Sequence, residues 1–127
     1  ANKVYFSVTH FFNSAPLAAS KATLEELKKQ NAVECMNYHG ELLKKGLIST
    51  AKDHGFDLRV TGVPAMPYFR IEHENKKLHS IWSDECLSRG IYLTSYHNHF
   101  LSIAHGEEEV DLIIKIASEA FDAVSKL

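Results

Sequence analysis

The sequence has 127 residues, of which 45% are hydrophobic and 24% are charged. This composition suits one compact domain with a buried core and excludes an intrinsically disordered segment. Lysine and arginine number 14 against 16 aspartate and glutamate residues, and no basic run exceeds two residues. The charge therefore argues against nucleic acid or an anionic membrane as a partner.

The chain is also predicted to be soluble and cytoplasmic. Its first residues lack the charged and apolar regions of a secretory signal, and no apolar run approaches the roughly 18 residues of a membrane helix. Its two cysteines, Cys35 and Cys86, lie far apart and lack the spacing of paired metal ligands. They are expected to be free thiols in a reducing compartment.

The first quarter of the chain is predicted to form a strand followed by a helix. Val4–Val8 alternates enough to form a strand. Because this strand opens the chain with almost no lead-in, it is expected to belong to a larger sheet. Asn13 or Ser14 can cap a helix whose first turn contains Pro16, where the missing amide proton costs nothing.

A second helix and two strands are predicted next. Apolar residues at helical spacing indicate a helix over Ala32–His54, and Gly55 supplies the left-handed residue that ends it. Leu58–Val63 and Tyr68–His73 have the composition of strands. They lie close enough in sequence to form an antiparallel pair.

The remaining part contains two further helices and two short strands. An amphipathic helix begins near Leu78 and stops at Gly90, and strands are predicted over Ile91–Leu93 and Phe100–Ile103. The final helix is marked by an apolar stripe that consists of Val110, Ile113, Ile114, Ala117, Ala120, Phe121 and Val124. This order predicts an α+β fold in which helices pack against a small, largely antiparallel sheet.

The sequence gives little support for a metal-binding site or for a catalytic nucleophile. The tightest histidine group is His97, His99 and His105, in which the first two would share one face of a strand. No metal-ligand motif accompanies them, so surface or hydrogen-bonded histidines are the preferred interpretation. Neither cysteine has an adjacent histidine and no Gly-x-Ser-x-Gly motif occurs, so no catalytic nucleophile is predicted.

One candidate anion site remains near the N-terminus. Thr9 ends the first predicted strand and a helix begins near Ser14, so the Thr9 hydroxyl and free backbone amides could converge on a phosphate. The alternative is a threonine with a purely structural role at the end of a strand.

Two stretches of the chain resemble a known enzyme family. The first is Val4–Thr9 followed by the alanine-rich segment Pro16–Leu27, and the second is Arg89–Leu93 followed by Phe100–His105 and acidic residues at 107–111. In their order and separation they resemble the part of class III aminotransferases that follows the catalytic lysine, especially the branch of the glutamate-1-semialdehyde aminomutases. The resemblance spans essentially the whole chain.

This resemblance implies the C-terminal part of a pyridoxal-phosphate enzyme of fold type I. Residues 1–12 would belong to the end of the large cofactor domain, and residues 13–127 would form the small α+β domain with its linking helix. Thr9 would donate to the phosphate of pyridoxal 5'-phosphate held by the neighbouring subunit of a homodimer. The substrates would be a small-molecule amino donor and a keto or aldehyde acceptor.

The resemblance also implies what these residues lack. In the family, the lysine that binds the cofactor and the aspartate at its pyridine nitrogen both precede this stretch. The lysines at 28, 29, 44 and 45 fall on predicted solvent faces of helices, where the amine stays protonated. No catalytic residue is therefore predicted in this chain.

Two alternatives stay open. The first is glutamate-1-semialdehyde 2,1-aminomutase, which is disfavoured because Tyr96–His99 stands where that branch tends to carry a glutamate. The second is a non-catalytic α+β module that binds a ligand or oligomerises through its sheet face or through Tyr92–Phe100.

Overall fold

A computed structural model describes Thr9 and residues 13–126 of the chain. The chain divides into two compact units, Ala1–Ala32 and Val33–Leu127. The strand predicted over Val4–Val8 lies outside the described residues. No described helix is long and apolar enough to cross a membrane.

The first unit contains helix α1 (Ser14–Lys29). Its predicted cap is confirmed, because the Asn13 side chain accepts a hydrogen bond from the Ala15 N–H at 3.2 Å. None of its residues is buried, and Leu17 and Leu24 expose 60% and 64% of their surface. The apolar side of α1 is thus solvent-exposed in the described chain.

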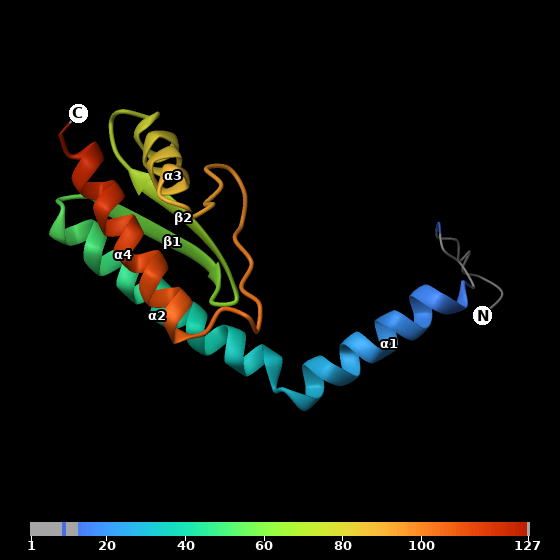
Figure 1. Ribbon diagram of the computed structural model, residues 1–127. Coiled ribbons are helices and arrows are strands. Elements are labelled where there is room, and N and C mark those ends of the chain that lie inside the picture. Colours follow the sequence, from blue (N-terminus) through green and yellow to red (C-terminus); the bar gives the residue numbers. More distant parts are fainter. Residues whose placement is uncertain (1–8, 10–12, 127) are drawn as a thin grey trace. The chain divides into compact units, whose positions relative to one another are not determined.

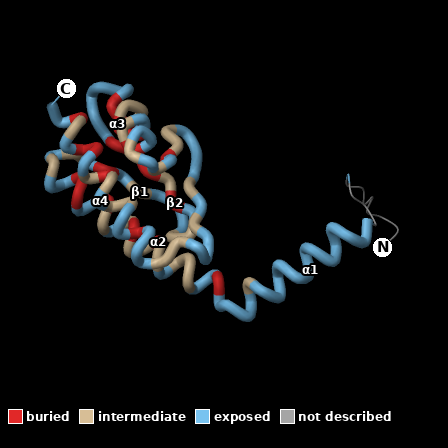
Figure 2. Tube along the Cα trace, in the orientation of Figure 1, coloured by how far each residue is buried: buried red, intermediate tan, exposed pale blue. Residues whose placement is uncertain are grey.

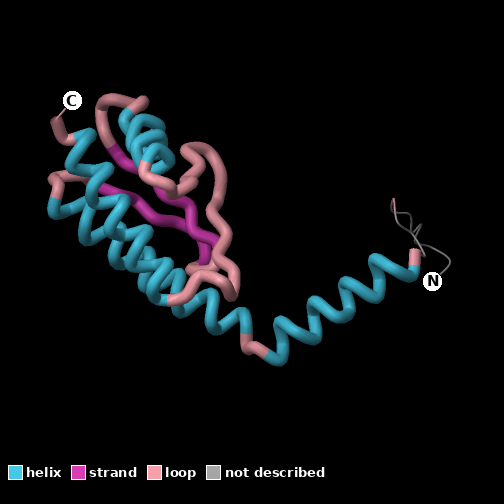
Figure 3. The backbone as a smooth tube through the Cα atoms, viewed as in Figure 1, coloured by secondary structure: helices cyan, strands magenta, loops and turns pink. Residues whose placement is uncertain are grey.

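The second unit begins with helix α2 (Ala32–Asp53) and a hairpin of two antiparallel strands, β1 (Asp57–Val63) and β2 (Met66–Glu72) (Figure 3). Gly55 has φ +80°, which confirms its predicted role as the left-handed end of the helix. In the hairpin, Leu58 lies opposite Ile71, and both are buried. The predicted antiparallel pair is therefore present.

Helices α3 (Leu78–Ser88) and α4 (Glu107–Val124) complete the unit. Figure 1 shows α2 and α4 side by side along the hairpin, and Gly46 of α2 faces the Ile114 side chain of α4. The first turn of α4 carries three glutamates, which favour the positive end of the helix dipole. The Glu109 carboxylate accepts from the Gly106 N–H at 2.9 Å and satisfies one free donor at this end.

The core of the second unit lies where α2, α3 and α4 meet the hairpin (Figure 2). Trp82 and Phe121 are fully buried and stack with ring centroids 4.9 Å apart. The Trp82 indole N–H donates to the Ala117 carbonyl at 3.3 Å, so its polar atom is also satisfied. The α4 stripe predicted from the sequence supplies Val110, Ala117, Ala120, Phe121 and Val124 to this core.

The two strands predicted after α3 are wrong. Ile91–Leu93 is irregular because the Ile91 N–H caps α3 by donating to the Cys86 carbonyl at 3.0 Å, with Gly90 at φ +96°. Phe100–Ile103 is also a loop. Only the His99 and Leu101 N–H groups bond to the start of β2, at the Pro67 and Ala65 carbonyls, which is too short a ladder for a strand.

Candidate functional site

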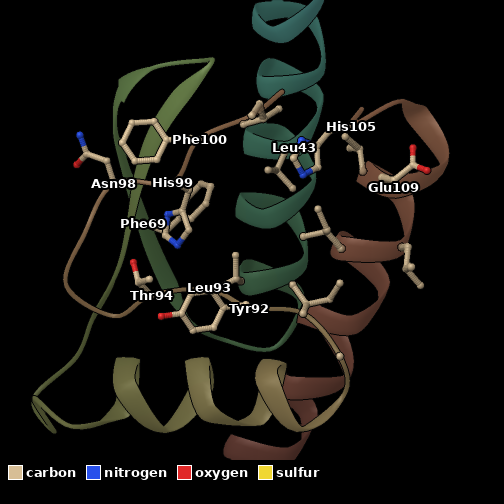
Figure 4. A pocket seen from close by; sticks show the side chains of 16 residues that line it. Leu43, Phe69, Tyr92, Leu93, Thr94, Asn98, His99, Phe100, His105 and Glu109 are labelled. Atoms are coloured by element: carbon tan, nitrogen blue, oxygen red, sulfur yellow. The ribbon is translucent and has the colours of Figure 1, made fainter. Parts of the chain in front are cut away.

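A pocket of about 480 Å³ lies between the loop that follows α3 and helices α2 and α4 (Figure 4). We call it the loop pocket, because residues 90–94 and 98–101 of that loop form much of its wall. Phe69 of β2, Leu43 of α2 and Ile113 of α4 supply other parts. Its size falls within the range of small-molecule sites.

Backbone hydrogen bonds hold the loop against the hairpin. The His99 N–H donates to the Pro67 carbonyl at 2.8 Å, and the Leu101 N–H donates to the Ala65 carbonyl at 3.0 Å. The Thr94 hydroxyl closes a local turn by donating to the His97 carbonyl at 3.1 Å. These bonds hold the part of the wall formed by His99 and Leu101 against the backbone of the hairpin turn and the start of β2.

His99 lies in the wall of the pocket, where burial disfavours the charged form of its ring. Its ring centroid is 4.8 Å from that of Phe69. Both ring nitrogens are shielded from solvent and have no hydrogen-bond partner among the described residues. Burial lowers the pKa of His99 and the nearby His97 lowers it further, while the backbone near Pro67 and Thr94 acts in the opposite direction without forming a hydrogen bond to the ring.

The structure does not bring the three candidate histidines together as ligands. His97 Nδ1 lies 3.0 Å from the Asn98 carbonyl oxygen, and His105 Nδ1 accepts from the Ser102 N–H at 2.9 Å. His99 is packed on Phe69 instead. Within the described residues, no group of three or more His, Cys, Asp or Glu side chains is arranged to hold a metal ion.

Thr9 is the residue that the family resemblance assigns to the cofactor, and its side chain is exposed. Thr9 lies in a turn and is exposed, while the residues on either side of it are not described. Lys28, Lys29 and Lys45 are exposed, and Lys44 is half-buried beside Glu41 at 3.6 Å. The described residues thus do not form a site for pyridoxal phosphate by themselves, and the contact of Thr9 with its phosphate stays a prediction.

The two free cysteines differ in environment, and we expect them to differ in reactivity. Burial raises the pKa of the Cys86 thiol to about 12, whereas Cys35 is half-buried with its Sγ 3.6 Å from Nδ1 of His39. In the native chain, Ellman's reagent should modify Cys35 and spare Cys86 until denaturant is added, because only a thiolate attacks the reagent. Equal rates for Cys35→Ser and Cys86→Ser would contradict this expectation.

Sequence reasoning named Tyr92–Phe100 as a possible ligand-binding segment but missed the other walls of the loop pocket and the buried His79. The pocket needs residues from α2, β2, α4 and the loop, which are distant in sequence. His79 is only 2% exposed, and its Nδ1 accepts from the Ile71 N–H at 3.4 Å. Its position one residue after Leu78, at the start of an amphipathic helix, gave no sign of this partner.

Comparison with known proteins gives a consistent set of relatives, although no family model matches the sequence. An aminopentol aminotransferase from Sphingopyxis macrogoltabida is 30% identical over 98% of this chain and 30% of its own length. A glutamate-1-semialdehyde 2,1-aminomutase from Caldivirga maquilingensis is 30% identical over 89% of this chain and 30% of its own length. The chain therefore spans about 30% of the length of the curated relatives it matches.

Solved structures agree with these relatives. The FumI protein of Sphingopyxis sp. MTA144, in its PLP internal aldimine form, superposes on 98% of this chain and 30% of its own with a TM-score of 0.89 and 28% identity. An omega-transaminase from Sphaerobacter thermophilus shares the fold over 95% of this chain and 30% of its own, with a TM-score of 0.83 and 16% identity. The chain is thus homologous to a segment of the class III pyridoxal-phosphate-dependent aminotransferases and glutamate-1-semialdehyde aminomutases, as its motifs predicted.

Proposed function

We propose that this chain is the C-terminal part of a pyridoxal-phosphate-dependent aminotransferase. The whole enzyme would move an amino group from a small-molecule amino donor to a keto or aldehyde acceptor. The observation that carries the proposal is the likeness to the FumI protein over 98% of the chain, at a TM-score of 0.89 and 28% identity. A relative with the name aminopentol aminotransferase supports it at 30% identity.

In this proposal the chain supplies contacts, and the rest of the enzyme supplies the reactive lysine. Pyridoxal phosphate, when bound, provides an electron sink that the protein lacks. The Thr9 hydroxyl would donate to the phosphate of the cofactor held by the partner subunit of a homodimer. Residues 1–12 would complete the large domain, and residues 13–127 would form the small domain with α1 as its link.

The mutase alternative is supported by the names of several relatives. The relative from Caldivirga maquilingensis carries the name glutamate-1-semialdehyde 2,1-aminomutase and is 30% identical. Against it, the Tyr96–His99 stretch offers no carboxylate. Transamination between two different molecules is therefore the preferred activity.

The decisive experiment concerns the native gene product. Its intact mass and its absorbance spectrum should be recorded after purification from the native cells, followed by an assay of amino transfer from a primary amine to pyruvate. We expect a longer, yellow protein with a lysine and an aspartate upstream of this stretch. A native product of this length alone, without bound cofactor, would overturn the enzyme proposal in favour of a binding or oligomerisation module.

Substitution of Thr9 tests the proposed phosphate contact. In the whole enzyme, Thr9→Val should weaken cofactor binding by about 10- to 100-fold, because a hydrogen bond to a charged group contributes about 1.5–3 kcal/mol. Thr9→Ser should retain most of the affinity. Thr23→Val is the matched control, since the exposed Thr23 hydroxyl only donates to the Ala19 carbonyl of its own helix. An unchanged dissociation constant for Thr9→Val would contradict the assignment.

A further inference from the structure

We propose that Cys35 and His39 together bind one divalent ion of the zinc class per chain. The ligand atoms are the thiolate Sγ of Cys35 and Nδ1 of His39, and water fills the other coordination positions. Both residues belong to α2, within the second unit. The proposed enzyme function uses neither of them, so the two proposals can fail independently.

The first support is the distance between the two ligand atoms. Cys35 and His39 lie four residues apart, which places their side chains next to each other on one face of the helix. Sγ of Cys35 is 3.6 Å from Nδ1 of His39. In a tetrahedral zinc site, bonds of about 2.3 Å to sulfur and about 2.0–2.1 Å to nitrogen place these two atoms about 3.6 Å apart. The pair therefore already has the separation that one shared ion requires.

The second support is that the helix and the imidazole ring are held in place without an ion. Leu43 and Leu47 of α2 are buried in the core, so packing fixes the backbone that carries both ligands. The His39 ring contacts the Tyr38 ring in an edge-on arrangement, with centroids 5.2 Å apart. The Tyr38 hydroxyl in turn donates to the Glu107 carboxylate of α4 at 3.1 Å. Binding of an ion therefore orders few additional side-chain torsions, which lowers its entropic cost.

The third support is access from solvent. Cys35 and His39 are both half-buried, so a hydrated ion can reach the pair, whereas Cys86 is fully buried. Among the described residues, no cluster of three or more His, Cys, Asp or Glu side chains is present. Cys35 and His39 thus supply two ligands of a four-coordinate shell and water supplies the rest, so the ion exchanges with solution.

The chemistry of the two donor atoms selects the ion. Thiolate sulfur and imidazole nitrogen suit Zn²⁺ and its softer relative Cd²⁺, whereas Mg²⁺ and Ca²⁺ prefer oxygen ligands. The thiol must release its proton and the imidazole must be neutral when the ion binds. The affinity should therefore fall as the pH is lowered from about 8 to about 6, because protons compete for both ligand atoms.

Titration with Cd²⁺ tests the proposal on the 127-residue chain, with both thiols kept reduced by a phosphine. The ultraviolet charge-transfer band of a cadmium thiolate should grow and saturate at one ion per chain. Zn²⁺ should displace Cd²⁺ and abolish the band, while an excess of Mg²⁺ should leave it unchanged. A folded chain that gives no saturable band, or that saturates at one ion per two chains, overturns the proposal.

Variants separate the paired site from binding by a thiol alone. Cys35→Ser should lack the band, and Cys86→Ala should keep it. His39→Gln should bind Cd²⁺ at least about tenfold more weakly, because the second ligand no longer acts within the same molecule, and His39→Cys should restore the affinity. His73→Gln is the matched control, since His73 is exposed and no cysteine lies four residues from it. Equal affinities of His39→Gln and the parent chain would assign the ion to a thiolate alone and overturn the proposal.

The whole native protein provides the last test. Saturating Zn²⁺ should slow the modification of Cys35 by Ellman's reagent at least about tenfold, because the metal-bound thiolate is no longer free to attack. EDTA should restore the rate, and Mg²⁺ should not change it. The difference between the parent protein and Cys35→Ser isolates this site from other cysteines. Protection in the 127-residue chain without protection in the whole protein overturns the proposal, whereas a lack of bound pyridoxal phosphate bears only on the proposed enzyme function.

Discussion

Gly40→Ala should destabilise the second unit by about 2–3 kcal/mol, even though alanine is the better helix former by about 1 kcal/mol. Gly40 lies inside α2 and faces the hairpin turn, and a Cβ atom there would overlap the Pro64 carbonyl group. The hairpin turn cannot move away from α2 freely, because the Ala65 N–H donates to the side-chain oxygen of Asn37 on α2 at 3.2 Å. The Ala65 carbonyl also accepts from the Leu101 N–H, so the strain would reach the loop pocket.

Urea denaturation at pH 7 measures this effect, with Gly46→Ala as the matched control. Gly46 also lies inside α2, but a Cβ there would meet the Cδ1 and Cγ1 atoms of the Ile114 side chain rather than backbone, and a side chain yields more easily than a hydrogen-bonded turn. The same gain in helix propensity should therefore be offset by a smaller strain, with a net change of about 1 kcal/mol or less. If Gly40→Ala and the parent chain had equal free energies of unfolding, the hairpin turn could move away from α2 at little cost, which would contradict this prediction.

The chain should also lose stability in mild acid because His79 is buried in its neutral form. Burial, with smaller contributions from Arg70 and His99, lowers the pKa of His79 to about 4. Since Nδ1 accepts from the Ile71 N–H, the proton resides on Nε2, which has no partner among the described residues. The ring also lies near Trp82, with centroids 5.7 Å apart. A second proton would place a charge in this apolar contact.

The sign and range of the effect follow from proton linkage. The unfolded chain takes up the His79 proton near pH 6.5 and the folded chain only near pH 4. The stabilisation is thus fully present above about pH 6.5 and is lost as the pH falls towards 4, by about 3 kcal/mol in all. The lowered pKa of His99 acts in the same direction.

Urea midpoints between pH 7.5 and pH 4.5 test this expectation. His79→Asn keeps an acceptor near the Ile71 N–H but cannot take up a proton, so its stability should depend much less on pH than that of the parent chain. His73→Asn is the control, because His73 is exposed and is not among the groups that shift the pKa of His79 or His99, so its replacement should change the slope much less. A His79→Asn slope equal to that of the parent chain would assign the acid sensitivity to other groups.

Much of the local structure could be predicted from the sequence. The α4 stripe, the Asn13 cap and the stop at Gly55 depend on residues within a few positions of one another, and helical periodicity and capping express such local relations directly. The family resemblance likewise depends on ordered motifs along the chain. These features did not need a tertiary contact to be recognised.

The errors and omissions have two different origins. Ile91–Leu93 has the composition of a strand, but the Ile91 N–H is used to cap α3. The closeness of Cys35 and His39 on one helix face was overlooked, although their spacing of four residues was visible in the sequence. The candidate contact of Thr9 remains a prediction in both the sequence and the structure.

The sequence by itself determined the four helices, the ends of two of them at Gly55 and Gly90, the antiparallel pair of strands and the resemblance to the family, because each follows from local spacing or from motif order. Only the tertiary structure decided where the loop after α3 lies, that Phe69 and His99 stack, and that a pocket without a cation among its described lining residues forms between the loop, α2 and α4. Burial is the physical reason. It depends on which distant residues exclude water from a side chain, and it is the largest of the effects that lower the pKa values of His79 and His99.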